Sequence, residues 1–490
     1  MLQAYTWPQS VVPGEPVGLH VSTDAGAFRV TVTREGANPE DVWSEAGIAA
    51  SHPMPPDASA NGCGWPAALQ IPVGEDWSSA YYSVTVTAGD ERTDAFLVVR
   101  PALGAAKASI LLVLSTSTWN AYNDWGGPSL YTGGTQVSFE RPMAPGFLVK
   151  PEPARRKAQP LTAADPEARY FFDWAEPLGL SVWSGGAGWW NWERVITNWA
   201  ESQGFALDVA TSHDLEDHPD VLDGHRLFLC AGHDEYWSWG MRDALDAFTA
   251  AGGNAAILSG NTCYWQVRFE DAGRTMVGYK YGASSDPVIG TADERFLTSA
   301  WVDRRIGRSE FSTIGLSFSR GGYARYGLGT PRSSGGSTVW RPEHWVFEGT
   351  GLAYGDALGQ ADTICAYEVD GCELELKNGR PVPTHRDGAP ESLEVLASAP
   401  AHLWSQLEQP TRYRHEPGEL ESVAQTIHGE TWQDHLEEHR YTHAVIGTFE
   451  TPGGGTVFNT GCTDWTYGLE GRDPAIERIT RNVLSRLSSG

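Results

Sequence analysis

Apolar and polar residues alternate along several short segments of the first 100 residues. The segments are 17–23 (VGLHVST), 28–36 (FRVTVTREG), 81–89 (YYSVTVTAG) and 94–101 (DAFLVVRP), with Gly, Pro and Asp turns between them. A period of two residues is typical of strands with one buried face. The pattern predicts a small immunoglobulin-like β-sandwich over residues 1–100 and a linker at 101–107.

The pattern changes after residue 108, where fully apolar runs alternate with amphipathic ones. Residues 109–118 (SILLVLSTST) are expected to form a buried strand, and strands are also expected at 205–212, 225–232 and 254–260. Residues 192–204 and 237–253 have helical periodicity and end on Gly. Strands that alternate with helices predict an α/β domain over 108–490 with a parallel sheet and right-handed crossovers.

The C-terminal half adds β-rich segments to this core. Residues 270–345 are rich in Gly, as in 311–329 (FSTIGLSFSRGGYARYGLG), which predicts a β-rich insertion. Residues 443–461 predict a hairpin around a Gly turn, and 473–487 (DPAIERITRNVLSRL) predict a closing helix.

Charge and composition exclude several classes of partner. The chain has 35 basic and 62 acidic residues, a formal net charge of −27, so nucleic acid and anionic membrane surfaces would be repelled. No apolar run reaches the ~20 residues of a membrane-spanning helix. The first residues (MLQAYTWPQS) lack a basic and an apolar leader segment, so we expect a cytoplasmic protein.

The cysteines point to no disulfide framework. There are 6 of them, and none forms a C-x-x-C pair. We therefore expect buried, reduced thiols rather than disulfides or a zinc site.

Polar and aromatic residues are concentrated after three of the expected strands, at 115–131 (STSTWNAYNDWGGPSLY), 232–237 (GHDEYW) and 260–268 (GNTCYWQVR). Ligands of open parallel sheets bind beyond the carboxyl ends of the strands. These segments are therefore the expected site, with pocket residues Trp119, Tyr122, Asn123, Trp125, Trp237 and Trp265.

Two chemistries are compatible with these residues. A nucleophilic hydrolase would need a Ser or Cys at a strand–helix elbow, where the chain has GHDEYW instead; Cys263 is better placed than Cys230, which lies inside a strand. A hard ion such as ferric iron would accept oxygen donors, and Tyr236, Tyr264 and Glu348 would supply them if their segments converge.

Each of these residues also has a structural interpretation. His233 and Asp234 could cap the helix that follows them. The Trp residues could be ordinary core, and Glu348 could be half of an ion pair.

Several motifs of this chain resemble motifs of a known family and occur in the same order. They are WNAYNDWGGPSLY, VSFERP, AGHDEYWS, GNTCYWQVRFE, HWVFEGTGLAYGD and GGTVFNTG, which span about residue 108 to the end. This part of the chain resembles the large (beta) subunit of N,N-dimethylformamidase and its relatives.

The resemblance implies an α/β core similar to class I glutamine amidotransferases and a mononuclear iron, Fe³⁺, held by two tyrosines and one glutamate. Matched by motif, those ligands are Tyr236, Tyr264 and Glu348, with His344 as the nearby histidine. The implied activity is hydrolysis of the C–N bond of a small linear amide, which could carry N-alkyl groups. Proton transfer and oxyanion hydrogen bonding would fall to His233, Glu235, Asn261 and His344.

The large subunit of the characterised enzyme is longer and works with a small partner subunit, so a small partner or a homo-oligomer is expected here as well. Two other interpretations stay open. The 21 Trp residues also suit a non-catalytic module that binds carbohydrate or another small ligand. A Cys-dependent hydrolase would use Cys263.

Overall fold

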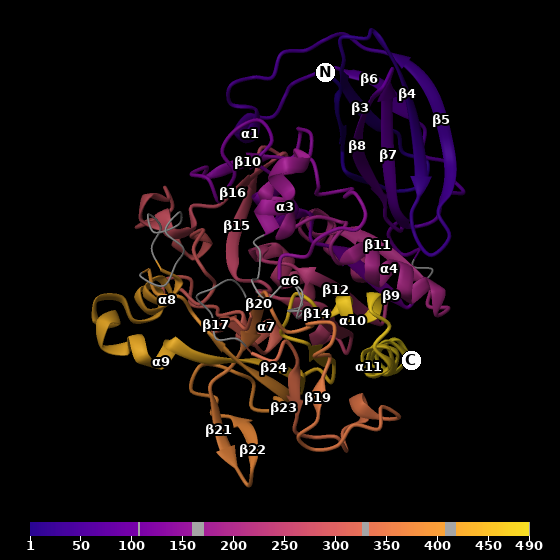
Figure 1. The fold of residues 1–490 in the computed structure, drawn as a ribbon. Helices are drawn as coiled ribbons and strands as arrows, with labels where there is room; N and C mark the ends of the chain where they lie inside the picture. The colour runs from indigo at the N-terminus through magenta and orange to yellow at the C-terminus, as the bar shows by residue number, and fades with distance from the viewer. Residues whose placement is uncertain (106–107, 159–170, 326–332, 407–417, 490) are drawn as a thin grey trace. The chain divides into compact units, whose positions relative to one another are not determined.

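A computed structural model describes residues 1–105, 108–158, 171–325, 333–406 and 418–489 (Figure 1). Part of the predicted linker, at 106–107, and residues 326–332 of the predicted insertion lie outside this range.

The contacts divide the chain into two compact units. Unit 1 is Met1–Ala154, Ala175–His225 and Arg268–Gly278, and unit 2 is Arg155–Trp174, Arg226–Val267 and Tyr279–Gly490. The predicted boundary near residue 100 stays a prediction.

The N-terminal part of unit 1 is built from two sheets. One has the strand order β1-β3-β6 and the other β2-β8-β7-β4-β5. Apolar side chains that alternate along β3, β4 and β7 meet in one core, which includes Leu19, Val30 and Val84. The bounds are β1 Gln3–Trp7, β2 Ser10–Val11, β3 Val17–Ser22, β4 Ala27–Arg34, β5 Glu40–Ile48, α1 Ala58–Asn61, β6 Ala67–Ile71, β7 Ala80–Ala88 and β8 Glu91–Val99.

The rest of unit 1 contains a parallel strand pair, β9 with β11. The predicted helix at 192–204 is confirmed as α4. The strand predicted at 109–118 ends earlier than expected, because Thr116–Tyr122 form α2. The bounds are β9 Ile110–Leu114, α2 Thr116–Tyr122, β10 Gln136–Ser138, α4 Glu193–Ser202, β11 Leu207–Thr211, α5 Ser212–Asp217 and β16 Thr275–Val277; α3, Phe171–Ala175, is divided between the units.

Unit 2 is built around a mixed sheet with the order β12-β14-β25-β24-β23-β17-β20. Strands β12, β14 and β25 are parallel neighbours, and the others are antiparallel. The strand bounds are β12 Leu227–His233, β13 Tyr236–Ser238, β14 Asn254–Gly260, β17 Ser317–Tyr323, β18 Ser337–Val339, β19 Ala357–Leu358, β20 Glu368–Gly371, β21 Leu374–Lys377, β22 Arg380–Pro383, β23 Glu394–His402, β24 Tyr441–Glu450 and β25 Thr456–Asn459; β15, Trp265–Glu270, is divided between the units.

The helices of unit 2 include the two that the sequence predicts. The predicted helical segment at 237–253 contains α6, and the closing helix is α11, whose N-terminus is capped by Asp473. The bounds are α6 Trp239–Ala250, α7 Phe311–Ile314, α8 Glu419–His428, α9 Leu436–Arg440, α10 Thr466–Glu470 and α11 Pro474–Ser488. Among the described residues, no helix is long and apolar enough to span a bilayer.

Strand β20 crosses the carboxyl ends of β14 and β25. Val369 forms a β-bridge with Cys462, and the Thr463 amide donates to the Glu368 carbonyl at 3.1 Å. At Gly260, the last residue of β14, an added Cβ would meet that same carbonyl. A strand that is distant in sequence therefore lies at the edge where the sequence predicts a site.

Candidate active site

Two loops at the carboxyl edge of β12 and β14 are held together by backbone hydrogen bonds. The strands are in register, with His233 opposite Gly260. Beyond them, the carbonyl of Glu235 accepts from the amides of Tyr264 at 3.0 Å and Trp265 at 2.9 Å. The structure therefore brings these two segments of the expected site together.

The loop after β14 has an unusual backbone. Asn261 and Cys263 have φ of 49° and 55°, a left-handed region that non-Gly residues seldom adopt. Such conformations are often found at functional sites, where the surrounding structure supports them.

A histidine lies between two buried carboxylates at this edge. The His233 Nε2 is 2.7 Å from an oxygen of Glu368 and 3.3 Å from an oxygen of Glu235. The other oxygen of Glu235 accepts from the Trp265 indole at 2.7 Å. Both carboxylates thus contact one ring atom, Nε2, where they can stabilise a proton on that nitrogen.

Glu368 is held in its ionised form. Burial raises the pKa of its carboxyl, but the charge of His233 and hydrogen bonds from His233, Asn261 and Tyr367 outweigh this and lower the pKa. The Asn261 amide donates to it at 3.0 Å. Asn261 Oδ1 has no hydrogen-bond partner among the described residues. The amide of Asn261 therefore holds Glu368, while its oxygen is a buried acceptor.

Both predicted tyrosine ligands lie at this edge. Tyr236 is paired with Trp265 in the β13–β15 ladder, and Tyr236 and Tyr264 are buried. Burial, together with Glu310, Glu419 and Glu235, raises the pKa of the Tyr264 phenol far above its ordinary value. Without a cation beside it, this phenol stays protonated.

A pocket of about 290 Å³ opens onto Tyr264 and Trp265. Its walls come from the turn at 280–284 and from α8. The Lys280 ammonium is 5.4 Å from the centre of the Tyr236 ring and 5.2 Å from that of Trp265. The pocket has room for a small molecule and brings it to an aromatic wall.

Carboxylates outnumber cations around this edge. The buried acidic side chains are Asp234, Glu235, Glu310, Glu368 and Asp370. Burial raises the pKa of Asp370 to about 8 and that of Glu310 to about 7. Burial also lowers the pKa of the neighbouring Lys157 to about 8, although Glu368 acts in the opposite direction. The site therefore favours an additional cation.

The structure places Glu348 and His344 elsewhere in unit 2. Glu348 is exposed, and its carbonyl accepts from Asn482 of α11 at 2.8 Å. His344 caps the 3-10 turn Trp345–Phe347 with its Nδ1. Burial lowers the pKa of His344. Within the described part of the chain, neither residue contacts His233, Glu235 or Tyr264. Geometry gives no support to their predicted roles and brings Glu368 to the site instead.

The predicted pocket residues of unit 1 have structural contacts of their own. The Trp119 indole donates to Glu193 at 3.0 Å, and Tyr122 packs on Tyr131 with ring centres 4.1 Å apart. Asn123 Oδ1 accepts from the Trp125 amide at 3.1 Å, and the Trp125 indole donates to Gln3. In unit 2, the Trp237 indole donates to the Asp234 carbonyl at 3.1 Å. Their role in substrate binding stays a prediction.

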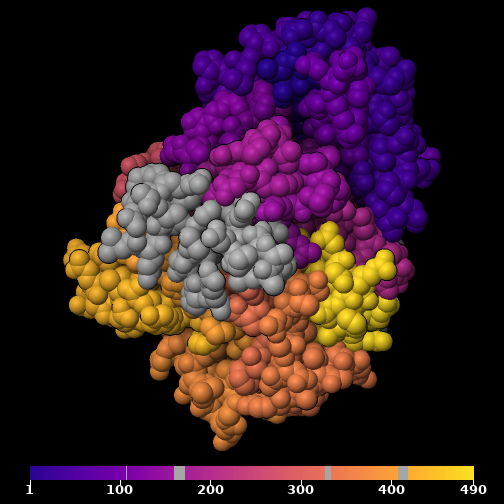
Figure 2. Space-filling model, viewed as in Figure 1, coloured from indigo at the N-terminus to yellow at the C-terminus, as the bar shows by residue number. Residues whose placement is uncertain are grey.

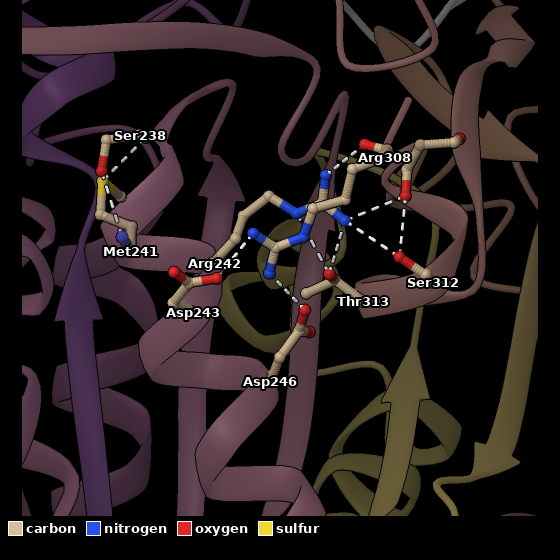
Figure 3. A network of polar contacts seen from close by, with 9 residues as sticks. Ser238, Met241, Arg242, Asp243, Asp246, Arg308, Ser312 and Thr313 are labelled. Atoms are coloured by element: carbon tan, nitrogen blue, oxygen red, sulfur yellow. Dashed lines mark hydrogen bonds and ion pairs between the residues drawn. The ribbon is translucent and has the colours of Figure 1, made fainter. Parts of the chain in front are cut away.

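The alternative that His233 and Asp234 cap the next helix is wrong. Ser238 caps α6 by accepting from the Met241 amide at 3.1 Å. Figure 3 shows this cap and the buried Arg242, which donates to the Ser312 and Thr313 hydroxyls and to the carbonyl of Arg308. The GHDEYW loop therefore does not cap α6, and the helix behind it is firmly anchored.

The thiol of Cys263 is poorly suited to act as a nucleophile. Burial raises its pKa well above the ordinary value and outweighs the opposing charge of Arg242, while Glu310, Asp234 and Asp246 each add a smaller increase. All 6 cysteines are buried and free of disulfides. This environment disfavours the thiolate that a Cys hydrolase needs.

Glu368 is not among the site residues that the sequence predicts, although its place in the chain carries a signal. Glu368 and Asp370 interrupt the apolar run ICAYEVDGC at positions two apart, which puts both carboxylates on one face of a buried strand. Buried charges of this kind are expensive unless they are paired or functional.

Comparison with known proteins identifies the family. A family described as N,N-dimethylformamidase beta subunit-like, C-terminal, matches residues 29–479. The chain belongs to this family.

Two relatives are N,N-dimethylformamidase beta subunits, from Paracoccus aminophilus and from an Alcaligenes species. Each is 25% identical over 473 residues, which cover 86% of this chain and 54% of the relative. The chain thus spans about half the length of these curated relatives.

Proposed function

We propose that this chain hydrolyses the C–N bond of a small linear amide, using one ferric iron bound by Tyr236, Tyr264 and Glu368. The observation that carries the proposal is the buried His233, whose Nε2 contacts Glu235 and Glu368. Glu235 in turn accepts from the indole of Trp265, which lines the pocket together with Tyr264. Membership of the family, whose named relatives are N,N-dimethylformamidase beta subunits, supports the reaction class.

The donor set fits such an ion. Phenol and carboxylate oxygens are hard ligands, which ferric iron prefers over thiols. The edge carries an excess of buried carboxylates, and a cation would relieve their repulsion. It would also reverse the effect that keeps the Tyr264 phenol protonated.

The chemistry that iron supplies when bound is polarisation of the amide carbonyl and activation of water. Proton transfer, hydrogen bonding and positioning are assigned to residues of the chain. His233 Nε2 holds a proton between two carboxylates and can pass it to the departing amine. Asn261 Oδ1 can accept from a water molecule or an amide N–H. Glu235, fixed by the Trp265 indole, keeps His233 in position.

The pocket supports a small substrate. Its volume of about 290 Å³ is just below the ~300–1,000 Å³ of ligand pockets in general. Trp265 and Tyr281 supply apolar surface for N-alkyl groups, while the ammonium of Lys280 would repel a cationic amide. A neutral amide of few atoms therefore fits this pocket.

We also propose an oligomeric state and a fold class for the chain. The named relatives are beta subunits, so we expect a small partner subunit or a homo-oligomer, which light scattering of the purified protein can test. The site beyond the carboxyl ends of β12 and β14 supports a core similar to class I glutamine amidotransferases.

Metal analysis of matched variants tests the ligand set. The wild-type protein is expected to contain about one iron per chain and to show a tyrosinate-to-iron absorption band. Glu368→Gln, Tyr236→Phe and Tyr264→Phe should lose iron, whereas Glu348→Gln and Tyr281→Phe should retain it. Retention in Glu368→Gln with loss in Glu348→Gln would overturn the assignment of Glu368.

Turnover separates hydrolysis from the two alternatives. The protein is expected to release amine from members of a panel of formamides and acetamides. The rate of amine release should decrease as the iron content of the protein decreases. Thermal shifts by sugars without any turnover would instead favour a binding module. Activity that survives iron removal but is abolished by iodoacetamide would favour a Cys hydrolase.

A further inference from the structure

A second group of possible metal ligands lies in unit 2, at the end of α8. His428 closes α8, and Glu438 and His439 belong to α9. One ligand atom from each of the three residues lies within 4.8 Å of the others. None of the three belongs to the iron site proposed above.

The two imidazoles face each other through the atoms that would bind a metal. The Nε2 atoms of His428 and His439 are 2.9 Å apart. In a tetrahedral zinc site with Zn–N bonds of 2.0–2.1 Å, two such nitrogens lie about 3.3 Å apart. An outward shift of a few tenths of an ångström would therefore accommodate the ion.

A third histidine orients the carboxylate. His435 Nδ1 is 3.0 Å from an oxygen of Glu438, and the His435 ring is stacked on that of His428 with centres 3.8 Å apart. Contacts of this kind fix the orientation of metal ligands. Arg320 donates to the Glu438 carbonyl at 3.0 Å and brings a positive charge to the group, which the carboxylate balances.

We propose that His428, Glu438 and His439 bind one Zn²⁺ ion, with His435 as a positioning residue. Two imidazoles and one carboxylate form a ligand set that zinc takes up with water in the fourth position. Magnesium and calcium, which prefer oxygen ligands, are not expected to compete. His428 is half-buried and Glu438 exposed, so the fourth position can face solvent.

The ion would act on the helix that forms part of the pocket. Glu419, the first residue of α8, accepts from the Tyr323 hydroxyl at 2.7 Å, and the oxygen of that hydroxyl lies 3.4 Å from an oxygen of Glu368. Ser422, Gln425 and Thr426 of the same helix line the pocket. Figure 2 shows α8 and α9, in gold at the left of the view, at the surface. Zinc would therefore tie the far end of α8 to α9 and steady this wall.

Zinc titration of the full chain by calorimetry tests the site. The Tyr264→Phe variant should be used alongside the wild type, because it disables the proposed iron site. Both are expected to bind one Zn²⁺ at the histidines with the same affinity. Cobalt in its place should show the visible bands of tetrahedral coordination.

Variants of the ligands should weaken this binding. His428→Ala and Glu438→Gln are each expected to lower zinc affinity by tenfold or more, and His435→Ala by roughly tenfold with an unchanged circular dichroism spectrum. His443→Ala, which alters an exposed histidine of β24, is the matched control and should bind as the wild type does. His428 and Glu438 are preferred over the fully buried His439, whose loss could unfold the chain.

The proposal is overturned if the wild type does not bind zinc, or if His428→Ala and Glu438→Gln both bind as tightly as His443→Ala. Absence of iron from the purified protein would refute the proposed function but leave the zinc result unaffected.

Discussion

Replacing Glu193 by Gln should make the stability of unit 1 less dependent on pH. Glu193 begins α4 and is buried, and one of its oxygens accepts from Ser115 at 2.5 Å and from the Trp119 indole at 3.0 Å. Burial raises the pKa of its carboxyl from 4.5 to about 7, against the smaller effect of these hydrogen bonds. Gln keeps the shape and the acceptor oxygen but cannot ionise.

The size of the change in stability follows from the difference between the folded and unfolded pKa values of Glu193. A folded-state pKa above the unfolded one means that the native protein holds its proton longer, so stability is lost as pH rises from about 4.5 to about 7. At 1.36 kcal/mol per pKa unit, the loss is about 1 kcal/mol at pH 5 and about 3 kcal/mol at pH 8. Unit 1 has roughly 200 residues, for which 1 kcal/mol corresponds to about 2–4 °C in Tm.

Thermal unfolding of wild type and Glu193→Gln between pH 5 and pH 8 measures this difference. The Tm of the variant relative to wild type should rise by about 4–8 °C over this range. Any effect of the amide that does not depend on pH cancels in the comparison. The exposed Glu176, changed to Gln, is the control and should show little of this trend. A Tm difference that stays constant from pH 5 to pH 8 would refute the reasoning.

Three other variants or treatments test the edge of the sheet. Gly260→Ala should destabilise the protein by about 2 kcal/mol or more and lower its iron content, because the added Cβ would lie 2.5 Å from the Thr463 amide nitrogen and press on β20. Gly282→Ala is the control, since an added Cβ there has nothing within 4 Å; equal urea midpoints for the two variants would contradict the prediction. Arg242→Lys should cost about 2–4 kcal/mol in urea unfolding, since Lys cannot replace the hydrogen bonds that hold α7; a loss below about 0.5 kcal/mol would count against that network. Iodoacetamide at pH 8 should leave Cys263 unmodified in the native protein, because burial raises the pKa of its thiol; rapid labelling seen by mass spectrometry would revive the Cys mechanism.

Much of unit 2 near the site could be predicted from local sequence. The apolar runs at β12 and β14 and the helical period of α6 depend on residues close in the chain. Parallel strands end at one edge of a sheet, so the sequence predicts GHDEYW and GNTCYW at that edge, and the pairing of β12 with β14 brings them together. The positions of Tyr236 and Tyr264 just beyond these strands therefore sufficed to place both phenols at one edge.

Other parts of the site depend on contacts between distant segments. Glu368 reaches His233 because β20 pairs with β17 and bridges to Cys462, neither of which has a local signature. Glu348 fitted a motif, but the turn before it packs beside α11, and the side chain is exposed. The spacing of His428, His435 and His439 was visible in the chain, but only the fold of α8 against α9 makes two of the rings meet.

The sequence by itself thus determined the strands, the main helices and the edge at which chemistry is expected, because hydrophobic periodicity and strand direction are local properties. Only the tertiary structure decided which carboxylate meets His233 and which histidines meet one another. Those partners are selected by the pairing and packing of segments far apart in the chain, where burial requires each charged group to find a counterpart.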